Sequence, residues 1–274
     1  METLSDMKLR VAIIRAAVSL QNMVNEMQKK HLELKRMTKT ATILLKTGFS
    51  SPGLFASLEK KCVETQHRDG GWVAIVDTMW NIAFLSQIDS QKYAANISAG
   101  KEYLLKNIGP NGIWGRSVRD FERIPVSGTL LFLLPDMATE DRLLALEKLW
   151  ISEKNSLTYK ASYTLMAFKR NHYIPQQAHL VSETMAWLIN NQRCDGSFAP
   201  WKEHPVSSDT YCTAIALLGM LSYPKFADST IIEKAATWLI ETQLPEGIWP
   251  YHEIEDGGGW ALFALSCMKN RGGN

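Results

Sequence analysis

The sequence has few of the features that mark secreted, membrane-spanning or nucleic-acid-binding proteins. It contains four cysteines in 274 residues and no Cys-x-x-Cys pair, which argues against a disulfide framework or a zinc knuckle. No apolar run reaches the ~18 residues of a membrane-spanning helix, and no secretory signal is visible. A formal charge of +2, without lysine and arginine clustered among aromatics, argues against nucleic-acid binding. These absences predict a cytoplasmic protein.

Apolar sequence at helical spacing is abundant, and a recurring turn interrupts it. Hydrophobic residues make up 46% of the chain and charged residues 21%, the balance of a globule with a large core. Four times a helical segment ends in glutamine or asparagine, followed by glycine and a bulky apolar residue, at 66–72, 107–114, 192–198 and 243–249. The spacing of about 42 residues between Asp69 and Asn111, and about twice that to Asp195, predicts a degenerate unit at Lys154-Asn155-Ser156.

Segments with one apolar face alternate with segments that are apolar on nearly all sides. The pairs are 9–34 with 38–46, 54–66 with 77–85, 97–106 with 126–134, 141–152 with 161–168, 177–191 with 209–221, and 230–242 with 260–268. A helix that is apolar all round must be buried all round, so the alternation predicts two concentric layers. We expect one all-α domain, residues 1–274, in which six outer helices surround six inner helices as an (α/α)6 barrel. An open helical solenoid is the alternative.

Two of the expected inner helices begin with the same dipeptide, Asp77-Thr78 and Asp209-Thr210. The structural interpretation is a helix N-cap, a position that aspartate favours. The functional interpretation follows from the fold, because the start of an inner helix faces the centre of such a barrel. The repeated step therefore marks two candidate catalytic carboxyl groups.

The residues after Asp77 predict the surroundings of its carboxyl group. Trp80, Asn81 and Phe84 follow it at i+3, i+4 and i+7, on the same predicted helix face. A carboxyl group in an apolar, aromatic pocket has a raised pKa and acts as a general acid.

Aromatic residues near the predicted mouth of the barrel are candidates for binding a cationic intermediate. Tryptophan and tyrosine ring faces attract cations by about 0.5–2 kcal/mol each. Tyr211 and Trp260, on the inner helices, are the strongest candidates, and Trp249 and His252 precede the last inner helix.

The turns at 66–72, 192–198 and 243–249 resemble the QxxDGxW motifs of the squalene-hopene and oxidosqualene cyclase superfamily. The two Asp-Thr steps resemble the end of that family's DxDDTA acid motif. Because the chain has room for one barrel, it is similar to the monodomain class II terpene cyclases of the merosterolic acid synthase type.

The resemblance implies that an aspartic acid protonates a terminal alkene or epoxide of a linear prenylated substrate. A carbocation cascade would then form a polycyclic terpene or meroterpenoid. No cofactor or metal is implied, and Mg²⁺ would be recruited only by a diphosphate substrate. A lipophilic substrate also implies peripheral membrane contact.

The full DxDD cluster is absent, since the two sites read Ala74-Ile75-Val76-Asp77 and Val206-Ser207-Ser208-Asp209. A single aspartate must then act, helped by a partner that polarises its carboxyl group. The candidate partners are His252, His204 and Asn81, although a surface or capping role is the alternative for the histidines.

Asp77 is preferred over Asp209 as the proton donor. Its neighbours are apolar, whereas Ser208 and Thr210 would stabilise an ionised Asp209. We expect Asp209 to fix the pocket or take part in proton return.

Two other classes of protein stay open. Protein prenyltransferase β subunits have similar Gly-aromatic turns and hold zinc with an Asp-x-Cys pair and a distant histidine. Here two residues separate Asp209 from Cys212, and no histidine follows in Gly257-Gly258-Gly259-Trp260, which disfavours zinc and leads us to predict no metal site. His252 lies close enough in sequence to keep the zinc alternative open. A non-catalytic helical-repeat module, the other alternative, would have a barrel filled with side chains.

Three arginines, Arg116, Arg119 and Arg123, follow the Trp114 turn. Guanidinium groups match carboxylates and phosphates bidentately, so this loop is a candidate clamp for an anionic head group. A solvated loop is the alternative. The sequence predicts neither the prenyl chain length nor the oligomeric state.

Overall fold

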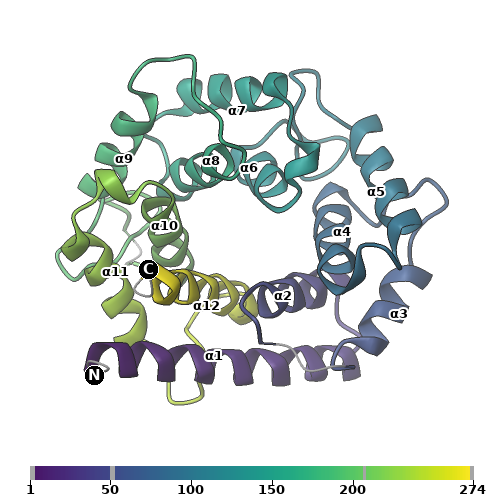
Figure 1. Cartoon of the computed structure of the whole chain (residues 1–274), viewed down its shortest axis with the longest axis horizontal. Coiled ribbons are helices and arrows are strands. Elements are labelled where there is room, and N and C mark those ends of the chain that lie inside the picture. Colours follow the sequence, from purple (N-terminus) through teal and green to yellow (C-terminus); the bar gives the residue numbers. More distant parts are fainter. Residues whose placement is uncertain (1–3, 50–52, 206–207, 272–274) are drawn as a thin grey trace.

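The chain folds into two concentric rings of helices. The computed structural model describes residues 4–49, 53–205 and 208–271, and these residues form twelve α-helices, two short 3-10 helices (Pro135–Met137 and Pro224–Phe226) and no strand. The outer ring consists of α1 (Leu4–Lys29), α3 (Ala56–Glu64), α5 (Ala94–Lys106), α7 (Glu140–Glu153), α9 (Leu180–Asn190) and α11 (Ser229–Glu241). The inner ring consists of α2 (Leu34–Lys46), α4 (Ile75–Asp89), α6 (Ile124–Leu133), α8 (Thr158–Arg170), α10 (Thr210–Ser222) and α12 (Ile254–Arg271) (Figure 1). The predicted (α/α)6 barrel is confirmed.

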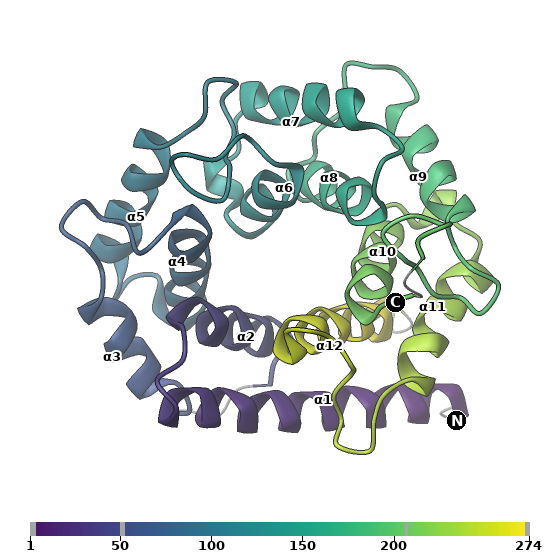
Figure 2. The ribbon, with the colours of Figure 1, turned by 180° about the vertical axis from the view of Figure 1, so that it is seen from behind.

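The pattern of buried residues explains why each helix lies in the inner or the outer ring. In α10 every residue from Cys212 to Met220 is buried, as expected for a helix covered on all sides. In α11 only the stripe Ile232, Ala235, Ala236 and Leu239 is buried. Figure 2 shows the same arrangement from behind, with the inner ring enclosed by the outer one. No helix in the described ranges is both long and apolar enough to cross a bilayer.

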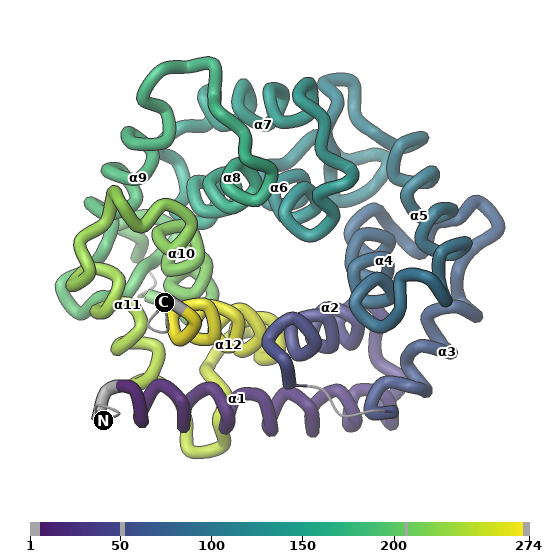
Figure 3. The backbone as a smooth tube through the Cα atoms, in the orientation of Figure 1, coloured from purple at the N-terminus to yellow at the C-terminus, as the bar shows by residue number. Residues whose placement is uncertain are grey.

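The glutamine of each complete turn joins its own repeat to the next one. Its side-chain amide donates one hydrogen bond to the carbonyl of the turn glycine and one to a carbonyl of the following outer helix. On that helix the acceptors are Asn96 for Gln66, Ile231 for Gln192 and Ala12 for Gln243, at 2.9, 2.8 and 2.9 Å. The third of these bonds runs from the last turn back to α1, so it closes the ring (Figure 3). An open solenoid is excluded by this closure.

The turn glycines adopt a backbone conformation that side chains resist. Gly70, Gly112, Gly196 and Gly247 have φ between 86° and 92°. Asn155, in the turn between α7 and α8, also has a positive φ of 64°, in the left-handed region that asparagine tolerates. The predicted degenerate unit is therefore present, with asparagine in place of glycine.

Candidate active site

The amino-terminal turns of the inner helices enclose two adjoining cavities. Their volumes are about 560 Å³ and about 620 Å³. Both are lined by Arg116, Pro125, Val126, Tyr211, His252 and Asp256. These volumes are typical of small-molecule sites. The barrel is therefore hollow at this end, unlike the filled barrel expected of a non-catalytic module.

The third residue of every inner helix lines one of the cavities or both. These residues are Arg36, Asp77, Val126, Lys160, Cys212 and Asp256. The amino-terminal turns of all six inner helices therefore lie at the same end of the barrel. Asp77 thus faces the centre, as predicted. Asp256 does so too, although it was not among the residues predicted from the sequence.

The aromatic residues that end the turns, here called turn aromatics, show which residues of α4 and α10 occupy equivalent positions in the repeat. The amide of Trp72 donates a hydrogen bond to Thr78 Oγ1 at 3.0 Å, and the amide of Phe198 donates one to Thr213 Oγ1 at 3.0 Å. Thr78 and Thr213 therefore occupy the same position in their helices. The residue before each faces a cavity, and in α10 that residue is Cys212.

Asp209 lies in a different position from Asp77. It is the N-cap of α10, and its Oδ1 accepts a hydrogen bond from the amide of Cys212 at 2.6 Å. The predicted equivalence of the two Asp-Thr steps is wrong, because the threonine that accepts this hydrogen bond lies 15 positions after the turn aromatic in α10 and only 6 positions after it in α4. Asp209 lines the second cavity. Val206 and Ser207 lie outside the described residues.

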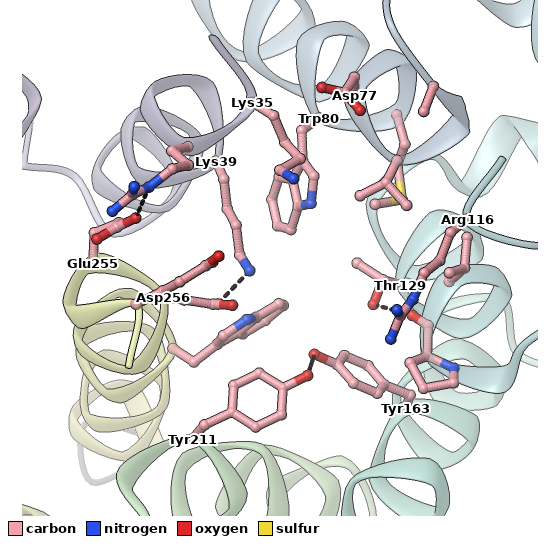
Figure 4. Close-up of a pocket in the computed structure, with 18 of the residues that line it drawn as sticks. Lys35, Lys39, Asp77, Trp80, Arg116, Thr129, Tyr163, Tyr211, Glu255 and Asp256 are labelled. Atoms are coloured by element: carbon pink, nitrogen blue, oxygen red, sulfur yellow. Dashed lines mark hydrogen bonds and ion pairs between the residues drawn. The ribbon is translucent and has the colours of Figure 1, made fainter. Parts of the chain in front are cut away.

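Asp77 is a half-buried acid on the wall of the first cavity. Burial raises the pKa of its carboxyl group above the ordinary value, and the nearby Lys35 ammonium opposes the rise. Figure 4 shows the carboxyl group beside Trp80 at the edge of the pocket. Within the described residues no other side chain hydrogen-bonds to it. Asp77 is therefore a carboxyl group that stays protonated to a higher pH than an exposed aspartate.

An aromatic wall extends from Asp77 across the first cavity. The rings of Trp80 and Trp260 meet edge to face with centroids 6.0 Å apart, and Tyr163 meets Trp260 at 5.9 Å. The hydroxyls of Tyr163 and Tyr211 are hydrogen-bonded at 2.7 Å, and burial raises the pKa of both tyrosines well above the ordinary value. These side chains come from α4, α8, α10 and α12 (Figure 4).

A lysine already occupies the ring faces of this wall. Lys39 Nζ lies 5.4 Å from the Trp80 ring centroid and 5.9 Å from that of Trp260, and it forms an ion pair with Asp256. The wall therefore presents electron-rich ring faces to a cation. Lys39 was not among the residues predicted from the sequence. The first turns of α2 also carry Lys35, Arg36, Thr38 and Thr40, so no local pattern distinguished Lys39.

Asn81 and Phe84 do not line either cavity, contrary to the prediction for α4. Asn81 is fully buried, and its Oδ1 accepts a hydrogen bond from the Thr38 hydroxyl of α2 at 2.8 Å. Phe84 is also fully buried, and its ring packs edge to face against Phe55 at 6.0 Å. Only the first two turns of α4 reach the cavity, whereas the predicted face continued down the helix.

The residues before α12 have different roles. Trp249 is buried behind the cavities, and its indole N–H donates to the Leu239 carbonyl at 2.7 Å, so its predicted contact with substrate is corrected to a scaffold role. His252 lines both cavities, as Tyr211 does. His204 lines neither and packs against Trp201 with ring centroids 4.2 Å apart.

The three arginines of the loop between α5 and α6 are not equivalent. Arg116 and Arg119 are both exposed, but Arg116 lines both cavities and Arg119 lines neither. Arg123 lines the second cavity but forms two hydrogen bonds with the Asp120 carboxylate, at 2.6 and 2.9 Å. The clamp predicted from three arginines is reduced to one free guanidinium.

The described residues contain no group of three or more histidine, cysteine or acidic side chains placed to hold a metal ion. The Cys212 thiol is buried, and burial together with Asp209 raises its pKa. The arrangement offers a carboxylic acid, electron-rich rings and a hollow interior, which are the elements needed to protonate and enclose an apolar substrate.

Comparison with known proteins adds a close match in fold. No protein-family model and no curated protein matches the sequence. Among solved structures, the type II terpene cyclase MstE from Scytonema superposes with a TM-score of 0.73 at 14% identity, over 97% of this chain and 99% of that one. A protein from Actinoplanes gives a TM-score of 0.71 at 12% identity, over 96% and 99% of the chains.

The same architecture also occurs outside the terpene cyclases. A possible member of the GH105 family from Salmonella enterica superposes with a TM-score of 0.60 at 10% identity, over 87% of this chain and 83% of that one. This match is less extensive than those above. The chain has the α/α-barrel fold of the type II terpene cyclase MstE.

Proposed function

We propose that the protein is a class II terpene cyclase in which Asp77 protonates the distal alkene of a linear prenylated substrate. The observation that carries the proposal is the Asp77 carboxyl group itself. It lies on the wall of a hollow barrel next to Trp80, and burial keeps its pKa raised. An acid-initiated cyclisation requires a protonated carboxyl group as the proton donor and a cavity that encloses the substrate.

The reaction moves one proton through the site. The Asp77 O–H bond breaks as a C–H bond forms at the less substituted carbon of the alkene, which leaves a tertiary carbocation and an Asp77 carboxylate. Each further alkene attacks the cation and forms one ring. Loss of a proton from a neighbouring carbon ends the cascade, so the product is an isomer of the substrate and the acid can be regenerated.

The wall formed by Trp80, Trp260 and Tyr163 supports the cationic stage. Each ring face attracts a nearby cation by about 0.5–2 kcal/mol, depending on how well water is excluded. Lys39 already lies over Trp80 and Trp260, and its ion pair with Asp256 offsets its positive charge.

The structural neighbours support the choice of substrate. MstE has been solved in complex with geranylgeranyl dihydroxybenzoate, named as its substrate, and with merosterolic acid A, named as its product. The cavities of about 560 and about 620 Å³ are of the size expected for a ligand of that class. Metal is not required by the proposed steps.

The test compares Asp77→Asn with Asp209→Asn, using geranylgeranyl dihydroxybenzoate as the substrate. The amide keeps the shape of the acid but cannot supply its proton, so Asp77→Asn should lower kcat by about 10²–10⁴-fold. Asp209→Asn replaces one good N-cap by another and should leave both fold and cyclisation largely intact. Product is measured as a cyclised isomer by mass spectrometry and NMR, and folding by circular dichroism. Wild-type turnover by folded Asp77→Asn would refute the assignment.

A further inference from the structure

Asp77 and Asp256 are two carboxyl groups of one cavity with opposite surroundings. Each is the third residue of an inner helix, and each lines the first cavity. Asp77 is half-buried, and burial raises the pKa of its carboxyl group. Asp256 forms an ion pair with Lys39, and the two side chains are only 16% and 17% exposed. A cavity in which one carboxyl group is kept as the acid and another is paired as the carboxylate contains both a proton donor and a proton acceptor.

Asp256 lines both cavities, whereas Asp77 lines only the first. Figure 4 shows the two residues on different walls of the pocket, Asp77 on α4 and Asp256 on α12. Because the cavities adjoin, a prenyl chain whose distal end is at Asp77 extends toward the second cavity. Each ring closure moves the positive charge along that chain and away from Asp77. Asp256 therefore lies where the later cations of the cascade would form.

The acidic residues that line only the second cavity have other partners. Oxygens of Asp209 and Glu122 accept hydrogen bonds from backbone amides at 2.6 and 2.9 Å, and Glu153 forms an ion pair with Lys160. None of these three acids lines the first cavity, where the aromatic wall lies. Among the acidic residues of the described ranges, Asp256 alone lines both cavities.

Asp256 lies close to the aromatic wall of the first cavity. Trp260 follows it at i+4 on α12. Its ion-pair partner Lys39 lies 5.4 and 5.9 Å from the ring centroids of Trp80 and Trp260. Burial is the main cause of the raised pKa of Tyr163, and the negative charge of Asp256 raises it further. The carboxylate is thus next to the rings that would surround a carbocation.

We propose that Asp256 is the base that ends the cascade, and that Lys39 is a positioning residue that keeps its carboxylate ionised. The inference rests on the proposed function, because it needs a cation generated by Asp77. In the last step a C–H bond beside the cationic carbon breaks, its electron pair forms a C=C bond, and the proton binds a carboxylate oxygen of Asp256. Each turnover moves one proton from Asp77 to Asp256, and proton exchange with water restores both groups after the product leaves.

The place of this base selects the product. A cyclised cation can lose a proton from any carbon next to the charge, and each choice gives a different alkene isomer. A general base removes the proton that lies within its hydrogen-bonding reach. Because the ion pair with Lys39 restrains Asp256 at the junction of the two cavities, one C–H bond is favoured. Asp256 therefore sets the position of the new double bond.

The test identifies the products that wild type, Asp256→Asn and Lys39→Gln form from geranylgeranyl dihydroxybenzoate. Asp256→Asn keeps the acid and removes the base. Consumption of the substrate should fall by less than about 10-fold, whereas formation of the wild-type isomer should fall by about 10²-fold or more. NMR and mass spectrometry should show a mixture of alkene isomers and a hydrated product in its place. Lys39→Gln keeps the carboxylate, so the wild-type isomer should stay its main product, formed more slowly.

Two further variants separate catalysis from folding. The double variant, Lys39→Gln with Asp256→Asn, leaves no unpaired charge from the ion pair and should give the product mixture of Asp256→Asn. Glu253→Gln is the matched control, because it removes a carboxylate that lines the first cavity but not the second. It should leave the wild-type isomer as the main product. Circular dichroism checks the folding of each variant.

Three results would overturn the inference. The first is the wild-type isomer as the sole product of Asp256→Asn, or of the double variant if Asp256→Asn does not fold. The second is the same product mixture from Lys39→Gln as from Asp256→Asn, because the ion pair would then be only a structural link between α2 and α12. The third is complete loss of substrate consumption by folded Asp256→Asn, which would assign Asp256 to the first step. Substrate left unchanged by the wild type would instead refute the proposed function, and the inference with it.

Discussion

The turn glycines can be tested as a matched pair, because two of them share a backbone conformation and differ in their surroundings. Gly112 has φ 86° and Gly196 has φ 92°. A Cβ built on Gly112 meets nothing within 4 Å, whereas one built on Gly196 collides with the backbone carbonyl of Lys234 in α11. Alanine at either position incurs the cost of the left-handed conformation, about 1–2 kcal/mol. At Gly196 the collision with rigid backbone adds about 1–3 kcal/mol.

These costs convert into melting temperatures. A chain of this size loses about 2 °C for each kcal/mol, so Gly112→Ala should lower Tm by about 2–4 °C and Gly196→Ala by about 4–10 °C. Thermal unfolding followed by circular dichroism at 222 nm measures both, and urea unfolding gives the free energies independently. Asn155→Gly is a useful third variant, because it restores glycine to the degenerate turn and should change Tm little. Equal losses for Gly112→Ala and Gly196→Ala would refute the argument that the close approach of the next outer helix requires glycine at Gly196.

Two further predictions concern pH and metal. Because the folded-state pKa of Asp77 lies above its unfolded value, kcat/KM should be highest at low pH and fall as pH rises through that raised pKa. The same shift means that the folded chain holds this proton more tightly, so the stabilisation from Asp77 is complete below the unfolded pKa and is lost as pH rises through the folded one. The Tm of Asp77→Asn relative to wild type should therefore increase with pH, and a pH-independent difference would contradict the burial of this carboxyl group. Cyclisation of geranylgeranyl dihydroxybenzoate should persist at full rate after dialysis against EDTA, and activity restored only by Zn²⁺ or Mg²⁺ would contradict a proton-initiated mechanism.

The barrel could be predicted from the sequence because its periodicity appears at two levels. The turns recur at the repeat length, and the inner helices are apolar on all sides, so both the number of layers and the pairing of helices follow. The repeat spacing alone placed a degenerate turn at Asn155. Its positive φ lies in the left-handed region, which asparagine tolerates, so asparagine can stand where the other turns have glycine.

The site was less predictable because it depends on loop length and helix rotation. The dipeptides at Asp77 and Asp209 are identical, yet the longer loop before α10 places the second aspartate at the N-cap, three positions before the cavity-facing residue. Phe84 was misassigned because helical spacing gives the face of a helix but not the depth to which a cavity extends. The pairing of Lys39 with Asp256 brings together opposite ends of the sequence, which no local pattern reveals.

The place of Asp77 in the first turn of α4 has a consequence for the chemistry after the proton has left. The N-terminus of a helix carries a partial positive charge from its aligned peptide dipoles, which stabilises a nearby anion by about 0.3–1 kcal/mol, and by up to about 2 kcal/mol when partly buried. Burial favours the neutral acid before the reaction, while the peptide dipoles of α4 act only on the carboxylate that forms during it. The aspartate left facing a carbocation is thus held as a weaker base than its burial alone would make it. The carboxylate therefore abstracts a proton from the first carbocation less readily, which favours ring closure over return to the substrate alkene.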